Sequence, residues 1–94
     1  MSDDEQQNEQ PARRGAGPPP MPVTAAPVGA EVELAEVRGG RGLVFRLAEM
    51  GLTPGVRFTV VSRGRPGPII ITLRGARLML GAGMAGRVYV RPVL

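Results

Sequence analysis

Glycine and proline divide this sequence into short segments, and that spacing limits what it can fold into. The 94 residues include 14 glycines and 10 prolines. The apolar runs between them, such as 69–71 and 78–80, have the length of single strands, and none approaches the roughly 20 residues of a membrane helix. The length allows one domain. The pattern therefore favours one small domain of short strands joined by tight turns.

Residues 1–20 differ in composition from the rest of the chain. They carry four carboxylates (Asp3, Asp4, Glu5, Glu9), show no apolar periodicity and end in three consecutive prolines. Such a segment cannot bury enough apolar area to offset its ordering entropy, so we expect a disordered tail. Its acidic start does not resemble a signal peptide, which predicts a cytoplasmic protein. The triple proline would be extended and could bind a proline-recognising module.

The remaining region, 21–94, predicts a mainly β domain. Val23 and Val28 are the expected first core anchors, and Gly75-Ala76 is the expected hairpin turn. In the first long strand Val32 and Leu34 share a face but neighbouring apolar residues do not, which indicates either burial on both faces or a β-bulge. About five strands at this spacing are typical of a small closed or nearly closed barrel. The expected strands cover 31–37, 56–63, 69–74, 77–80 and 86–92.

One short helix is predicted over 43–50. Leu43, Leu47 and Met50 are spaced to form one apolar stripe. Gly51 suits the left-handed residue that ends a helix, and Leu52 should then fold back on Leu47, as in a Schellman cap. The next four residues, Thr53-Pro54-Gly55-Val56, have the proline and glycine positions of a type II turn.

The residue types available exclude most catalytic and metal chemistry. The chain has no cysteine and no histidine, so it lacks the commonest nucleophile, general base and transition-metal ligands. A carboxylate pair at Glu31 and Glu33 is possible, but a solvated strand face explains these residues better. Methionines in strand and helix stripes are usually core residues. We therefore expect no enzyme activity, no cofactor, no metal site and no catalytic residue.

Charge leaves a nucleic-acid alternative open. The tail has four carboxylates and two arginines, a net charge of −2, whereas residues 31–94 have ten arginines and four glutamates, a net charge of +6. Ten arginines on a small barrel could follow a phosphate backbone. Single-strand binders usually add stacking aromatics, for which Phe45 and Tyr89 are the candidates. This signal is weak, and no stable nucleic-acid complex is expected.

The run RLAEMGLTPG at 46–55 resembles the signature of the ferrous iron transport protein A (FeoA) family, and supporting similarity extends over 22–94. The resemblance implies an SH3-like barrel and a non-enzymatic accessory role in bacterial ferrous iron uptake. The implied partner is the membrane ferrous-iron permease with its GTP-binding domain, which would hold the protein peripherally at the inner membrane. A transition-metal-responsive module is a weaker alternative, because the same barrel closes metal-dependent repressors. Residues 1–21 are not expected to supply the DNA-binding domain of such a repressor.

The resemblance also indicates a contact surface. Arg46, Leu47, Glu49 and Met50 are the candidate partner-binding residues. Arg46 and Glu49 should project outward one turn apart, whereas Leu47 could serve either the cap and core or the partner contact. The structural part of the signature is expected to fix backbone geometry and consists of Gly51, Leu52, Pro54 and Gly55.

Overall fold

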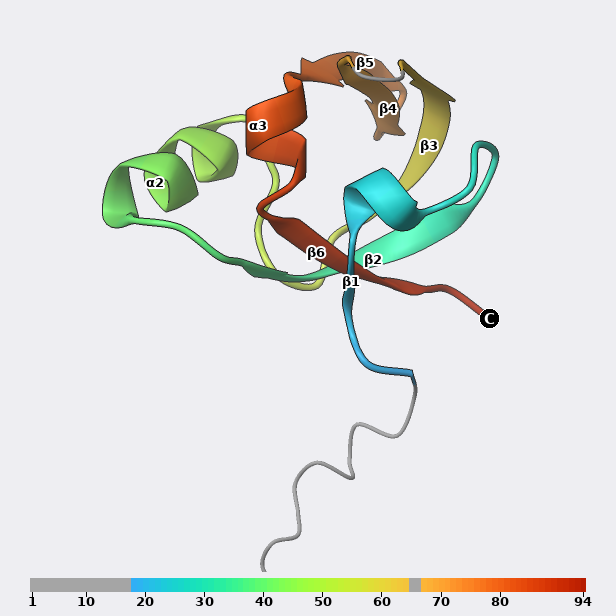
Figure 1. Ribbon diagram of the computed structural model, residues 1–94, viewed down its shortest axis with the longest axis horizontal. Coiled ribbons are helices and arrows are strands. Elements are labelled where there is room, and N and C mark those ends of the chain that lie inside the picture. Colours follow the sequence, from blue (N-terminus) through green and yellow to red (C-terminus); the bar gives the residue numbers. More distant parts are fainter. Residues whose placement is uncertain (1–17, 65–66) are drawn as a thin grey trace, which may run out of the picture.

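The computed structural model describes residues 18–64 and 67–94. Within them, short strands alternate with turns and three short helices (Figure 1). In chain order the elements are β1 (Met21–Pro22), η2 (Val23–Ala25, a 3₁₀ helix), β2 (Glu31–Val37), α2 (Arg41–Glu49), β3 (Arg57–Arg63), β4 (Ile69–Leu73), β5 (Ala76–Leu80), α3 (Ala82–Ala85) and β6 (Val88–Pro92).

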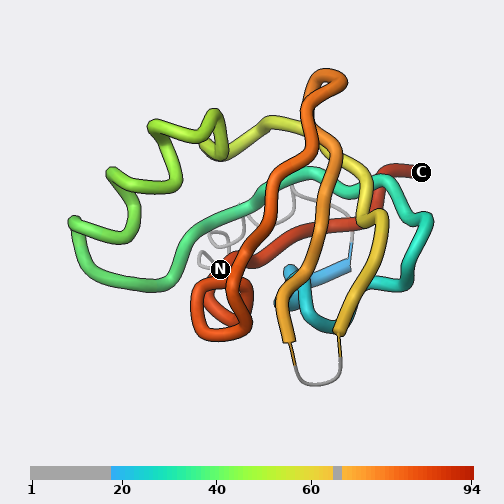
Figure 2. The backbone as a smooth tube through the Cα atoms, turned by 90° about the horizontal axis from the view of Figure 1, so that it is seen from above, coloured from blue at the N-terminus to red at the C-terminus, as the bar shows by residue number. Residues whose placement is uncertain are grey.

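The six strands form one antiparallel sheet in the order β1-β6-β2-β3-β4-β5. The sheet curls around a shared interior in the manner of a small SH3-like barrel (Figures 1 and 2). The prediction of a mainly β barrel with one principal helix is therefore confirmed. The strand beyond the predicted five is the two-residue β1, which pairs with β6.

Fifteen apolar side chains form a continuous core, and no polar or charged residue among those described is buried. Inward positions alternate along the strands, for example at Ile69, Ile71 and Leu73. Val23 is a core residue, but the expectation for Val28 is wrong: its side chain is 55% exposed. The reason is the turn at Pro27–Gly29, where Gly29 has a φ of 93° and the chain projects Val28 outward.

A β-bulge resolves the ambiguous pattern of β2. The register between β2 and β6 shifts between Leu34 and Glu36, and the extra residue is Ala35. Val32 and Leu34 are fully buried, whereas Ala35 and Val37 are only partly buried. Of the two alternatives left open by the sequence, the bulge is the one that the fold uses.

Helix α2 begins two residues before the predicted start and ends at Glu49, one residue before the predicted end, with Gly51 left-handed as predicted. Met50 is its C-terminal cap, and Gly51 follows with a φ of 91°. The Leu52 amide donates to the Leu47 carbonyl at 2.9 Å, and the Gly51 amide donates to the Ala48 carbonyl at 2.9 Å. These two bonds are the Schellman pair. The helix extends to one side of the barrel (Figure 1).

The β4–β5 hairpin turn lies one residue earlier than predicted. Arg74 and Gly75 are the central residues, with φ of 52° and 82°, and Leu73 pairs with Ala76. Two positive φ values in a two-residue loop define a type I′ turn. The predicted loop at 64–68 is only partly described, because residues 65 and 66 lie outside the described ranges. Most of the predicted 1–20 tail also lies outside them.

Substitution of Gly51 by alanine should destabilise the protein. The residue has a positive φ, and an added Cβ would lie 3.2 Å from the Leu73 Cδ2 atom. We expect a loss of about 1–2 kcal/mol in the free energy of unfolding, measured by chemical denaturation. Gly42→Ala is the matched control, because Gly42 lies in the same helix with open space around it. It should be neutral or stabilise by a few tenths of a kcal/mol, and equal losses in both variants would contradict this account.

Candidate partner-docking surface on helix α2

Helix α2 has apolar residues on two opposite faces. Its inner face consists of the three predicted residues: Leu47 is fully buried, and Leu43 and Met50 are half-buried against the core. The outer face consists of Val44, Phe45 and Ala48, all exposed. We call these three residues the outer face of α2.

The outer face presents an exposed aromatic ring. Phe45 is 67% exposed and Val44 is 42% exposed. Together with Arg41, Gly42 and Ala48 they line a shallow surface depression. Since Gly42 has no side chain, the ring of Phe45 is left open at the N-terminal end of the helix. An exposed apolar patch with a polar border is typical of an interaction site.

Charged side chains border this apolar patch. Arg46 and Glu49 are both exposed, as predicted. In the described part of the chain the ion pairs are Arg38–Glu36 and Arg57–Glu33, so neither Arg46 nor Glu49 is engaged in one. Both charges are therefore exposed on α2 and free of ion pairs with described residues, and Arg41 is the charged residue that lines the depression itself.

Leu47 does not belong to this surface. Its relative exposure is 0%, and its carbonyl accepts the amide of Leu52, which is also buried. The alternative in which Leu47 contacts a partner is thus corrected: the side chain serves the core and the cap. Met50 is half-buried at the C-terminal cap, so at most part of its side chain could reach a partner.

The signature residues after the helix fix its position. Gly51 and Leu52 complete the cap, and the turn with Pro54 closes through a bond from the Val56 amide to the Thr53 carbonyl at 3.1 Å. Gly55 has a φ of 98°, as the type II turn requires. The turn is then tied to β2, since the Gly55 amide donates to the Leu34 carbonyl at 2.8 Å.

The outer face itself was not predicted as a site. The sequence reasoning identified Phe45 only as a possible stacking residue and did not single out Val44 or Ala48. The available signal was a second apolar stripe at the i, i+1 and i+4 positions of the helix. A stripe of that kind on a helix that already has an inward face indicates that one of the two is unpartnered.

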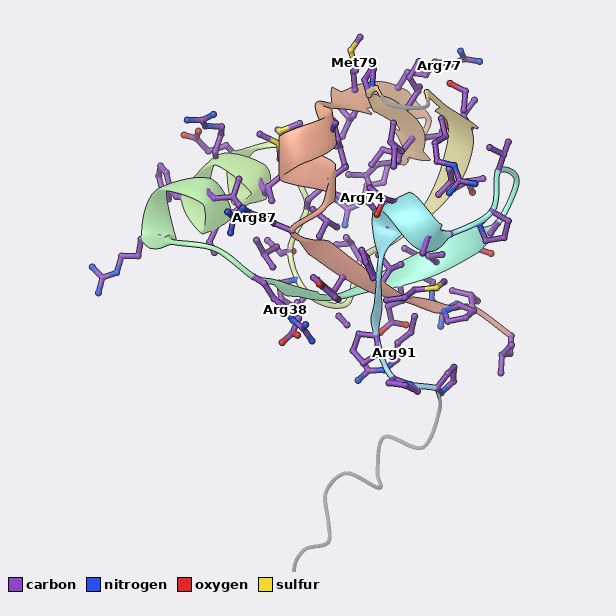
Figure 3. The ribbon with its side chains drawn as sticks, viewed as in Figure 1. Arg38, Arg74, Arg77, Met79, Arg87 and Arg91 are labelled. Atoms are coloured by element: carbon purple, nitrogen blue, oxygen red, sulfur yellow. The ribbon has the colours of Figure 1, made fainter. Side chains whose placement is uncertain are left out.

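The arginines labelled in Figure 3, all within the described ranges, are spread over the molecule rather than gathered into one stripe. Arg38 lies 3.7 Å over the centre of the Tyr89 ring and donates to Glu36, and this hydrogen bond raises the pKa of the Arg38 guanidinium above its ordinary value. Arg63 donates to two carbonyls of the N-terminal segment, at Thr24 and Ala26. Figure 3 shows Arg77 at the top of the molecule and Arg91 at the bottom. One candidate stacking ring, Tyr89, is thus covered, and the charges are dispersed.

The described residues contain no group of three or more carboxylates that could hold a metal ion. No helix in the described ranges is long and apolar enough to cross a bilayer.

Comparison with known proteins decides the family. The FeoA domain family matches residues 21–92. The chain is 33% identical over 69 residues to "Putative Fe(2+) transport protein A" of Methanocaldococcus jannaschii, a match that covers 73% of this chain and 83% of the relative. The chain belongs to the FeoA family. Membership connects it with ferrous iron transport.

Solved structures agree with the FeoA assignment. The crystal structure of an iron uptake regulatory protein (FeoA) superposes with a TM-score of 0.72 at 36% identity, covering 81% of this chain and all of that chain. A manganese-dependent transcriptional repressor in complex with manganese gives a TM-score of 0.75 at 22% identity, covering 83% of this chain and 39% of the repressor. The second likeness concerns the fold alone.

Two neighbouring residues of the FeoA helix should respond differently to truncation. Leu47→Ala removes a fully buried side chain and should cost about 2–5 kcal/mol of unfolding free energy. Phe45→Ala removes an exposed ring and should change stability by less than about 0.5 kcal/mol. Thermal and denaturant unfolding measure both, and a large loss for Phe45→Ala would mean that the ring is packed rather than exposed.

Proposed function

We propose that this protein is a non-enzymatic accessory component of ferrous iron uptake that acts in the cytoplasm. In this proposal it docks on the membrane ferrous-iron permease, at or near the permease's GTP-binding domain. Family membership supports the transport role. The observation that supports docking is the exposed outer face of α2, which presents the Phe45 ring beside Arg41, with the exposed charges of Arg46 and Glu49 on the same helix.

The physical argument for docking rests on what an exposed aromatic side chain can contribute. Burying a phenylalanine ring against a partner removes a large apolar area from water, and aromatic residues dominate the binding energy of protein interfaces. Arg46 and Glu49 would lie at the polar rim, where charges determine orientation and association rate more than affinity. An apolar centre with a charged border is the usual arrangement of such an interface.

The chemistry of the described residues supports a binding role over catalysis. The chain contains neither histidine nor cysteine, and the carboxylates of the described residues form no cluster of three or more. The proposal therefore assigns the iron chemistry to the permease and the contact surface to this protein. The dispersed arginines and the covered Tyr89 ring give the nucleic-acid alternative no specific support.

Reversing the charge of Arg46 and introducing a charge at Phe45 test the proposal in cells. Arg46→Glu and Phe45→Asp should each leave the protein folded, because both side chains are exposed, and should lower ferrous iron uptake severalfold by weakening docking. Uptake of radioactive Fe²⁺ is measured in cells whose own copy of the gene is replaced by each variant.

Val28→Asp is the matched control, because Val28 is also an exposed apolar residue but lies far along the chain from α2, in the turn before β2. It should support wild-type uptake. The docking surface is wrong if the Phe45 and Arg46 variants, folded and expressed at wild-type levels, also take up iron at the wild-type rate.

A further inference from the structure

Strand β5 is an open edge of the sheet. Its neighbour is β4, and the pairing runs without a register shift from Leu73–Ala76 to Ile69–Leu80. Figure 1 shows β5 at the top of the molecule, away from β1 at the other end of the sheet. An unpaired edge presents backbone donors and acceptors that can bind another strand.

The two edges of this sheet are protected to different degrees. β1 has two residues, one of them Pro22, and it follows the triple proline at 18–20, so this edge has few amide donors. β5 has five residues with no proline and no bulge. Short edges, prolines, bulges and charged side chains are the usual devices against strand addition, and of these β5 has only the charge of Arg77.

The hairpin geometry determines which backbone groups of β5 point outward. In a two-residue type I′ hairpin the pair that closes the loop, Leu73 and Ala76, exchanges both hydrogen bonds, and hydrogen-bonded pairs then alternate along the ladder. Leu78 and Leu80 therefore bond to β4. The amides and carbonyls of Arg77 and Met79 point away from β4, and no other backbone group in the described ranges bonds to them.

The side chains of β5 show the same alternation between covered and uncovered positions as its backbone groups. Arg77 and Met79 are both exposed on the outer face of the sheet, Met79 at 63%. This departs from the expectation that strand methionines fill the core. Leu78 points inward opposite Ile71 but is only half-buried at this edge. Both the backbone and the side chains of the strand are thus incompletely covered.

We propose that β5 is a self-association edge, at which a second copy of this chain adds its own β5 in antiparallel orientation. The two-fold axis passes between the two Leu78 residues. In this register Arg77 lies opposite Met79 of the second copy, and Met79 lies opposite its Arg77. All four outward-pointing backbone groups of each strand are then hydrogen-bonded, and the interface is isologous.

Charge disfavours one neighbouring register, and the length of β5 disfavours the other. A shift of two residues in one direction sets Arg77 against Arg77 of the second copy, and like charges directly opposite are destabilising. A shift in the other direction pairs Arg77 with Gly81, which lies beyond the end of β5. In the proposed register each guanidinium stem instead packs beside a methionine thioether. A strand of sequence ARLML is thus complementary to itself, which is why a second copy is the occupant.

The expected association is weak and concentration-dependent, because one pair of five-residue strands makes an interface well below the standard size. Sedimentation velocity on the full chain, from about 10 µM to about 1 mM, should show a monomer–dimer equilibrium. Backbone amide exchange measured over the same range should slow at Arg77 and Met79 as the concentration rises. The amide of Leu78 bonds to β4 in both states and serves as the internal control.

Charge variants make the register testable. Met79→Arg places an arginine opposite Arg77 of the second copy, at two symmetric positions in the dimer. The association constant should fall about tenfold or more. The double variant R77E/M79R sets opposite charges across the same pair and should restore it. Val28→Arg, at an exposed apolar residue outside the sheet edge, is the control and should dimerise like the wild type. All substituted side chains are exposed, and circular dichroism confirms the fold.

Three results would overturn the proposal. The first is a wild-type chain that stays monomeric at the highest concentration. The second is a dimer whose Arg77 and Met79 amides exchange as fast as in the monomer. The third is a Met79→Arg variant that dimerises like the wild type, or one whose weakened dimer the double variant does not restore. The measurements use purified protein, so their outcome is independent of iron uptake and of docking through α2.

Discussion

The hydrogen bond from the Leu52 amide to the Leu47 carbonyl holds the helix to the rest of the fold. Both side chains are in the core, and Gly51 between them takes the left-handed conformation that lets the chain turn back. The following turn is bonded to β2 through Gly55. Since α2 is fixed in this way at its C-terminal end, its inner face must point to the barrel. Its outer face is then left to the solvent.

Features that depend on local backbone chemistry could be predicted from the sequence. The Schellman cap, the type II turn and the strand alternation at Ile69 and Ile71 follow from residue types at fixed spacing. The outward direction of Arg46 and Glu49 follows from helical periodicity in the same way. The bulge in β2 was recognisable as one of two alternatives, because a period-2 pattern that changes phase has few explanations.

Features that depend on distant neighbours could not be predicted. Val28 and Met79 resemble core residues in sequence, but one lies on a turn that points outward and the other on the open edge of the sheet. The second apolar stripe at Val44, Phe45 and Ala48 did not show which of the two helix faces is exposed, because a helix stripe becomes buried only if another element covers it. The role of Leu47 was undecided for the same reason. Most of the fold was therefore accessible from the sequence, and the apolar half of the candidate site was not.

The position of β6 between β1 and β2 has a consequence for how the chain is made. Leu34 and Met21 both pair with Val90. Strand pairing near the start of the domain therefore requires residues near its end. Pairings this distant in sequence close slowly and contribute no stability until both partners are present. During synthesis β2 can pair with β3, but its other edge has no partner until β6 is made. The barrel can therefore close only after β6 has been synthesised and is free to pair with β1 and β2.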